Sequence, residues 1–149
     1  MKRLFLVVGV FFVMTGSAVS AGFSYFSEPT VPSSRRLSGA LDAGGYRLDA
    51  ARYVYDSYPA RIFHGRLPPL IHAVVVVETT VDGNGRTTEV RVIRGPSHAP
   101  DVTKAVIEMI RRVSPLPTPT NPGGYRFTET WLVHKDGRFQ LHTLSEGQD

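Results

Sequence analysis

The chain has 149 residues, of which 42% are hydrophobic, and this suits one domain with a modest core and a terminal extension. It contains no cysteine, which excludes disulfides, thiolate metal sites and a lipid-modified amino-terminal cysteine. Without Lys2 and Arg3 the 17 basic residues fall to 15, against 13 acidic ones. A net charge of about +2, spread along the chain, argues against nucleic acid as a partner.

The amino-terminal residues have the pattern of an export signal. Lys2 and Arg3 precede an uncharged apolar run, and small residues follow it as far as Ala21. This pattern predicts a secretory signal peptide over residues 1–21, cleaved after Ala21. The alternative is an uncleaved membrane anchor, because the uncharged stretch is long enough to cross a bilayer. In both cases we expect the rest of the chain in the periplasm, with membrane contact only through an uncleaved amino-terminal segment.

A change in composition separates this start from the domain. Residues 22–45 are rich in serine, proline and glycine and predict a flexible linker. Apolar residues then recur at helical spacing from Leu48 to Tyr55. We therefore expect a helix over residues 48–57 that ends before Pro59, because the residue before a proline avoids helical geometry.

The strongest local pattern is that of a β-hairpin. Residues 71–81 are rich in β-branched side chains, and residues 86–94 alternate between apolar and polar. Between them lie Asp82-Gly83 and Asn84-Gly85, pairs that readily form tight turns. The first strand carries valines on both faces, so we expect it to lie buried at the centre of a sheet.

A second helix and a second pair of strands follow. From Pro100 to Val113 apolar residues recur at helical spacing. After a loop rich in proline and glycine, residues 125–134 alternate as a strand, and residues 138–144 predict a fourth strand at the sheet edge. The polar residues 145–149 are expected to be frayed.

The order helix, strand, strand, helix, strand, strand predicts an α+β domain over residues 46–144. We expect an antiparallel four-stranded sheet with two helices packed on one face.

No group of residues has the spacing of a catalytic site. The five histidines fall on different predicted elements, and Ser97-His98 lacks the glycine-flanked turn of a hydrolase nucleophile. We therefore expect neither enzymatic activity nor a cofactor, and keep a hydrolase with an unrecognised site as a third alternative. His134 and His142 flank the last predicted turn and could bind zinc or copper, so the second alternative is a small periplasmic metal or ligand-binding protein.

Several motifs together resemble the C-terminal domain of the TonB and TolA energy transducers. The segment Tyr58-Pro59-Ala60-Arg61 resembles the Tyr-Pro motif that precedes the first strand in TonB domains. The hairpin over residues 75–94, the helix over residues 100–115 and the strand over residues 125–133 are similar to the elements that follow. The likeness covers residues 46–144. The short linker and the absence of histidine in the amino-terminal segment depart from TonB, so the resemblance is to a stand-alone domain without the motor coupling.

The resemblance implies a module that binds an envelope protein, such as an outer-membrane receptor or a transport component, by pairing with a sheet edge. In TonB-like domains the partner adds beside the C-terminal strand. We therefore expect the partner-binding residues there: Trp131, Arg138, Phe139, Gln140, Leu141 and His142. Trp131, the only tryptophan, is either an interface anchor or a core residue under a helix.

Overall fold

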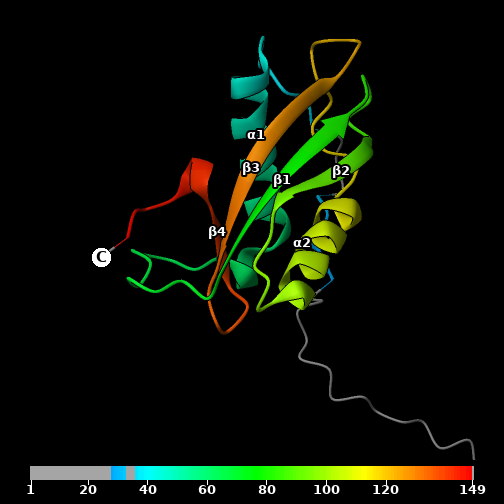
Figure 1. Cartoon of the computed structure of the whole chain (residues 1–149). Helices are drawn as coiled ribbons and strands as arrows, with labels where there is room; N and C mark the ends of the chain where they lie inside the picture. The colour runs from blue at the N-terminus through cyan, green and yellow to red at the C-terminus, as the bar shows by residue number, and fades with distance from the viewer. Residues whose placement is uncertain (1–27, 33–35, 149) are drawn as a thin grey trace, which may run out of the picture.

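The computed structural model describes residues 28–32 and 36–148, which form the helices and strands shown in Figure 1. The expected signal peptide over residues 1–21 lies outside the described residues. In chain order the elements are α1 (Ala43–Ser57), a 3₁₀ turn η1 (Pro59–Arg61), β1 (Ala73–Val81), β2 (Thr87–Arg94), α2 (Pro100–Arg112), β3 (Tyr125–Val133), β4 (Phe139–Leu141) and a second 3₁₀ turn η2 (His142–Leu144).

The four strands form one antiparallel sheet in the order β2-β1-β3-β4. β1 pairs with β3 over its whole length, from Ala73 opposite Val133 to Val81 opposite Tyr125, so it is central as predicted. The hairpin turn also forms as predicted, because Asp82 N–H donates to the carbonyl oxygen of Arg86 at 3.0 Å. The prediction of an α+β fold with a four-stranded antiparallel sheet is confirmed.

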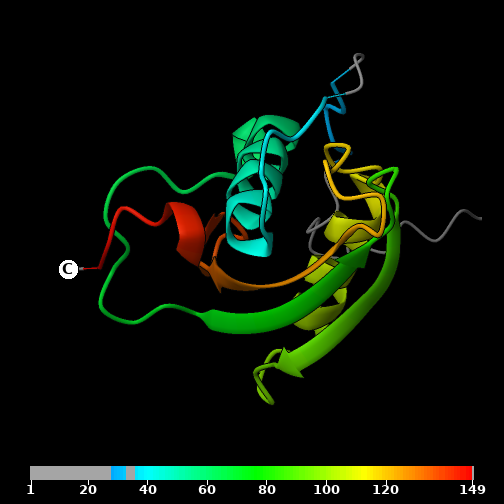
Figure 2. The same ribbon diagram turned by 90° about the horizontal axis from the view of Figure 1, so that it is seen from above.

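The core lies between one face of the sheet and the helices. Alternate residues of β1 are buried, and Val75 and Val77 are fully enclosed. Figure 2 shows α1 and α2 on the same side of the sheet. Trp131 is buried there, with its ring centroid 4.7 Å from that of Phe139. Trp131 was expected to be either an interface anchor or a core residue, and the structure supports the role in the core.

The Tyr-Pro segment joins the two helices. Tyr58 is buried at the end of α1, and its hydroxyl donates to the carbonyl oxygen of Met109 in α2 at 3.0 Å. Burial raises the pKa of Tyr58 to about 12, so this hydroxyl stays protonated at physiological pH. The tyrosine is thus a second donor to this carbonyl, which also accepts the N–H of Val113 at 3.3 Å, and it ties the end of α1 to α2.

The first helix begins five residues earlier than expected, at Ala43, so the end of the expected linker is helical. Asp42 explains the start, because its side chain accepts the N–H of Gly45 at 2.8 Å and caps the helix. Other described parts of the linker are also bonded to the domain: Ser38 N–H donates to the carbonyl oxygen of Thr118 at 2.9 Å. The domain therefore includes residues that the sequence assigned to a flexible tether.

The fourth strand is shorter than the expected 138–144, with only three residues in β4. At His142 the chain turns into η2 and leaves the sheet. A buried carboxylate explains this path, because Glu129 Oε1 accepts the N–H of Thr143 at 3.3 Å and holds the turn over the core.

The loop after α2 packs closely on the hairpin turn. Leu116 N–H donates to the carbonyl oxygen of Gly85 at 2.8 Å. Gly124 has a φ of 75°, and a Cβ there would lie 1.9 Å from the carbonyl oxygen of Val81. Only glycine allows the chain to enter β3 this close to the end of β1.

Candidate partner-binding edge

The structure buries most of the residues that the sequence assigned to partner binding. Trp131, Phe139, Gln140 and Leu141 each expose 2% or less of their surface. Only Arg138 and His142 are exposed. A partner strand therefore cannot contact most of this set without displacing parts of the fold, and the expectation of an exposed recognition surface on β4 is wrong.

The outer edge of β4 is covered by the chain itself. The covering segment is the strap, residues 62–67. Phe63 N–H donates to the carbonyl oxygen of Phe139 at 2.9 Å, and Ile62 forms a parallel bridge with the same residue. The buried amide of Gln140 donates to the carbonyl oxygens of Phe63 and Gly65 at 2.8 and 2.7 Å. The strap thus takes the place that a partner strand was expected to occupy.

The carboxyl-terminal residues hold the strap from the other side. Leu67 N–H donates to the carbonyl oxygen of Gly147 at 2.9 Å. The side-chain amide of Gln148 donates to the carbonyl oxygens of Pro68 and Pro69 at 2.9 and 2.8 Å. Figure 1 shows this carboxyl-terminal segment beside the green loop that contains the strap. The expected frayed tail is therefore bonded through residue 148.

The two histidines of the alternative metal site do not meet. His134 lies at the β3–β4 turn, where its backbone N–H donates to the carbonyl oxygen of Arg138. His142 follows the far end of β4. His134 Nδ1 lies 2.9 Å from Asp136 Oδ1, and its ring packs against Phe63 with centroids 4.9 Å apart. Over residues 28–32 and 36–148, no three histidine or acidic side chains gather as metal ligands.

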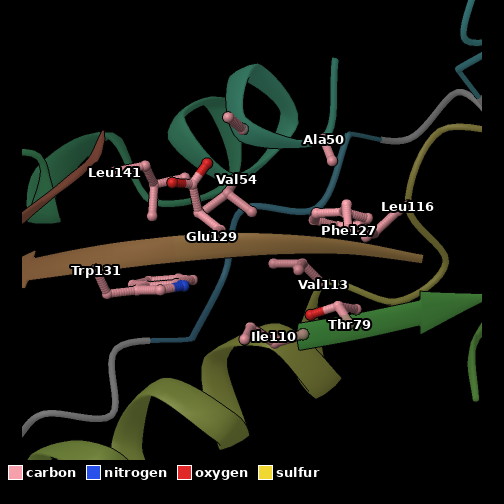
Figure 3. A pocket seen from close by; sticks show the side chains of 11 residues that line it. Ala50, Val54, Thr79, Ile110, Val113, Leu116, Phe127, Glu129, Trp131 and Leu141 are labelled. Atoms are coloured by element: carbon pink, nitrogen blue, oxygen red, sulfur yellow. The ribbon is translucent and has the colours of Figure 1, made fainter. Parts of the chain in front are cut away.

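One internal cavity contains an incompletely bonded carboxylate. It has a volume of about 20 Å³ and lies between α1, α2 and β3, with room for about one water molecule. Glu129 Oε1 accepts the N–H of Thr130 at 2.8 Å, but Oε2 has no partner. Figure 3 shows this carboxylate on the α1 side of β3, near Leu141 and Val54. The cavity is too small for an organic ligand, so Glu129 serves to hold η2.

A larger hollow lies at the start of the hairpin. It has a volume of about 340 Å³ and is lined by residues 71–74 and 94–98. His98 Nε2 lies 2.8 Å from the carbonyl oxygen of His72, and the two rings pack edge to face. This contact occupies one ring nitrogen of His98, and no acidic side chain lines the hollow. Among the described residues no three histidine or acidic side chains gather here as metal ligands.

The opposite edge of the sheet, at β2, is open. Within the described residues β2 has β1 as its only neighbour, and from Thr88 to Arg94 its backbone forms no hydrogen bond to any other segment. At the start of the strand, Thr87 N–H donates to Ser114 Oγ at 3.0 Å. Figure 2 shows β2 as the outermost strand, with α2 on the inner side of the sheet. This edge can accept another extended chain.

The exposed surface of β2 combines apolar and charged side chains. Val92 is 39% exposed and Ile93 is 49% exposed, whereas large apolar residues of the other strands are buried or half-buried. On the face turned away from the helices, Arg91 Nη2 lies 2.9 Å from Glu78 Oε1 of β1. Val92 and Ile93 offer apolar contact area, and the charged residues offer electrostatic selection.

Two irregularities limit the regular part of this edge. The β1–β2 register shifts between Val76 and Val77 and again between Thr80 and Val81. The four residues between these bulges, Glu89–Val92, pair one by one with β1. Bulges and charges at an edge also hinder indiscriminate strand pairing, so a partner needs a short, matching segment.

Comparison with protein-family models, with curated proteins and with solved structures finds no match. No helix formed by the residues that the structure describes is both long and apolar enough to cross a membrane. Over residues 28–32 and 36–148 the chain is thus a small α+β module whose sheet is covered by the strap at β4 and has no further neighbour at β2.

The strap contacts predict that Gln140 is essential for closing the β4 edge. We expect Gln140→Leu to lower the free energy of unfolding by about 1–3 kcal/mol, because it leaves two half-buried carbonyl groups, those of Phe63 and Gly65, without this donor. Gln148→Leu is the matched control, because the amide of Gln148 also bonds two carbonyl groups but this residue is exposed. We expect this variant to lower the free energy of unfolding by about 0.5 kcal/mol or less. Urea denaturation measures both. Equal losses would contradict the account.

The β3–β4 turn predicts a pH-dependent contribution to stability. The Arg138 side chain, at 2.7 Å, holds the pKa of Asp136 well below its ordinary value of 3.8, and His134 adds to this. A carboxyl group whose pKa is lower in the folded state than in the unfolded state stabilises the fold at pH values above its unfolded-state pKa. This stabilisation is lost as the pH falls through the folded-state pKa. We expect Asp136→Asn to cost roughly 1 kcal/mol or less at pH 7, because the pair is exposed to solvent. Thermal unfolding of the wild type and the Asp136→Asn variant should show a difference in melting temperature that shrinks below about pH 4. A difference that stays constant with pH would contradict this prediction.

Proposed function

We propose that this chain is a non-catalytic recognition module of the periplasm that binds an extended segment of an envelope protein along β2. An added strand gains backbone hydrogen bonds from a sheet edge, and its alternate side chains set the preference. The supporting observation is the contrast between the two edges. Among the described residues the backbone from Thr88 to Arg94 bonds only to β1, whereas the strap covers β4.

The resemblance to the TonB and TolA C-terminal domains supports the same class of function. The elements α1, β1, β2, α2 and β3 follow the order of the resembling motifs, with residues 58–61 between α1 and β1. The proposed partner is therefore an outer-membrane receptor or a transport component. The proposed contact differs from the one that the resemblance implies, because the strap already occupies the edge beside the C-terminal strand.

The side chains of β2 define the kind of segment that fits. Glu89, Arg91 and Arg94 are exposed and charged, and Val92 and Ile93 are exposed and apolar. An antiparallel segment that places apolar residues beside Val92 and opposite charges beside Glu89 and Arg91 would match both properties. A long hydrophobic strand without charges would leave both charges without a partner across the new ladder.

Proline substitutions along Glu89–Val92 test this proposal. In an antiparallel pair the N–H groups point alternately to the neighbouring strand and away from it. Proline removes the N–H, so we expect two of the four variants to keep their stability and lose partner capture. The loss should be about tenfold, equivalent to one or two backbone hydrogen bonds. The measurement is capture of envelope proteins by the immobilised full chain, with thermal unfolding of each variant.

The other two proline variants should instead lower the melting temperature, because they break hydrogen bonds to β1. Leu70→Lys is the matched control, since Leu70 is 90% exposed and lies outside β2, and capture should be unchanged. Unchanged capture by all stable proline variants would remove the β2 edge as the binding surface.

A further inference from the structure

The charged and apolar residues of β2 are sorted onto its two faces. Val90 lies opposite Thr79, and Val92 lies opposite Val77. Thr79 and Val77 are buried on the helix side of β1, and opposed residues of an antiparallel pair point to the same face. Val90 and Val92 therefore belong to the helix side, and Glu89 and Arg91 belong to the other.

The sequence of this segment is complementary to itself. When two copies of β2 pair antiparallel, every residue must meet one from its own face, so the two-fold axis passes beside a single residue. With the axis at Val90, Glu89 lies opposite Arg91 of the second copy, and the same contact occurs again by symmetry. On the helix side, Val90 meets Val90 of the second copy, and Thr88 meets Val92 of the second copy.

The neighbouring registers bring like charges together. An axis at Arg91 places the two Arg91 side chains opposite each other, and an axis at Glu89 does the same for the two glutamates. Like charges directly opposed in a ladder destabilise it, whereas opposite charges stabilise it. The charges therefore select the register centred on Val90, which uses residues 88–92 and stays close to the regular segment Glu89–Val92 between the bulges.

Existing contacts prepare Arg91 for a second carboxylate. Its Nε and Nη2 atoms lie 3.3 and 2.9 Å from Glu78 Oε1, and the guanidinium has further N–H groups to donate. Arg126 of β3 lies 3.9 Å from the same carboxylate. The carboxylate of Glu89 from the second copy would continue this row of alternating charges. Pairing would also cover Val92, which is 39% exposed in the single chain.

We propose that, when no envelope segment is bound, β2 pairs with the β2 strand of a second copy of this chain, in the antiparallel register centred on Val90. The inference rests on the proposed function, because it concerns the same edge, and an envelope segment would have to replace the second copy there. Two four-stranded sheets would then join into one continuous sheet, and the open edge of each copy would be closed by the other.

Charge reversal tests the register. We expect the full wild-type chain to form dimers in sedimentation experiments, and Glu89→Arg or Arg91→Glu alone to raise the dimer dissociation constant roughly tenfold or more. An equimolar mixture of the two variants should dimerise again, because each pair of opposed residues then carries opposite charges. Lys135→Glu is the matched control, since this exposed residue lies in the β3–β4 turn, and it should dimerise like the wild type.

A cysteine variant tests the axis directly, because the natural chain contains no cysteine. Residues opposed in an antiparallel pair have Cα atoms about 4.5–5.5 Å apart, within the range of about 4.4–6.8 Å that a disulfide allows. Mild oxidation should therefore link Val90→Cys into a covalent dimer, and Arg91→Cys should link much less. If Val90→Cys unfolds, a mixture of Thr88→Cys and Val92→Cys should cross-link instead.

A chain that stays monomeric at millimolar concentration, or equal cross-linking of Val90→Cys and Arg91→Cys, would overturn the inference. If the chain is monomeric and the proline variants of β2 still lose capture of another envelope protein, the second copy is wrong and strand addition at β2 stands. If neither dimerisation nor edge-dependent capture occurs, the proposed function fails as well.

Discussion

An open β-sheet has two edge strands, and the outward N–H and C=O groups of each need water, the same chain or another chain as partner. In this protein the outward groups of the two edge strands have different partners. Phe63 and the buried amide of Gln140 bind the strap to β4, whereas β2 has no such cover among the described residues. The path of the strap, the bonded carboxyl terminus and the position of the candidate surface all follow from this asymmetry.

The elements that depend on local signals could be predicted from the sequence. The hairpin formed because Asp82 and Gly83 favour a tight turn between two apolar strands, and α2 formed where apolar residues recur at helical spacing. The cap at Asp42 is also a local signal, but the glycines after it suggested a linker, although glycine inside the first turn of a capped helix costs only about 1 kcal/mol.

The closure of β4 could not be predicted in this way. Gln140 alternates with Phe139 and Leu141, so its pattern is that of an exposed polar residue on an edge strand. In the structure its amide is buried and donates to a carbonyl group 77 residues away in the sequence. Such a contact leaves no periodic pattern. The exposure of Val92 could not be predicted from the sequence either, because it depends on which strand lies at the edge of the sheet. The edge that the resemblance to TonB implies, beside the C-terminal strand, is the edge that the strap covers.

The asymmetry of the two edges can be tested most directly by amide hydrogen exchange, measured by nuclear magnetic resonance on dilute, monomeric protein. The amides of Phe63 and Leu67, which bond to Phe139 and Gly147, should be protected. Alternate amides between Thr88 and Arg94 should exchange almost as fast as in an unfolded peptide, because they point into water. Rapid exchange in the strap together with protection of every β2 amide would contradict the account.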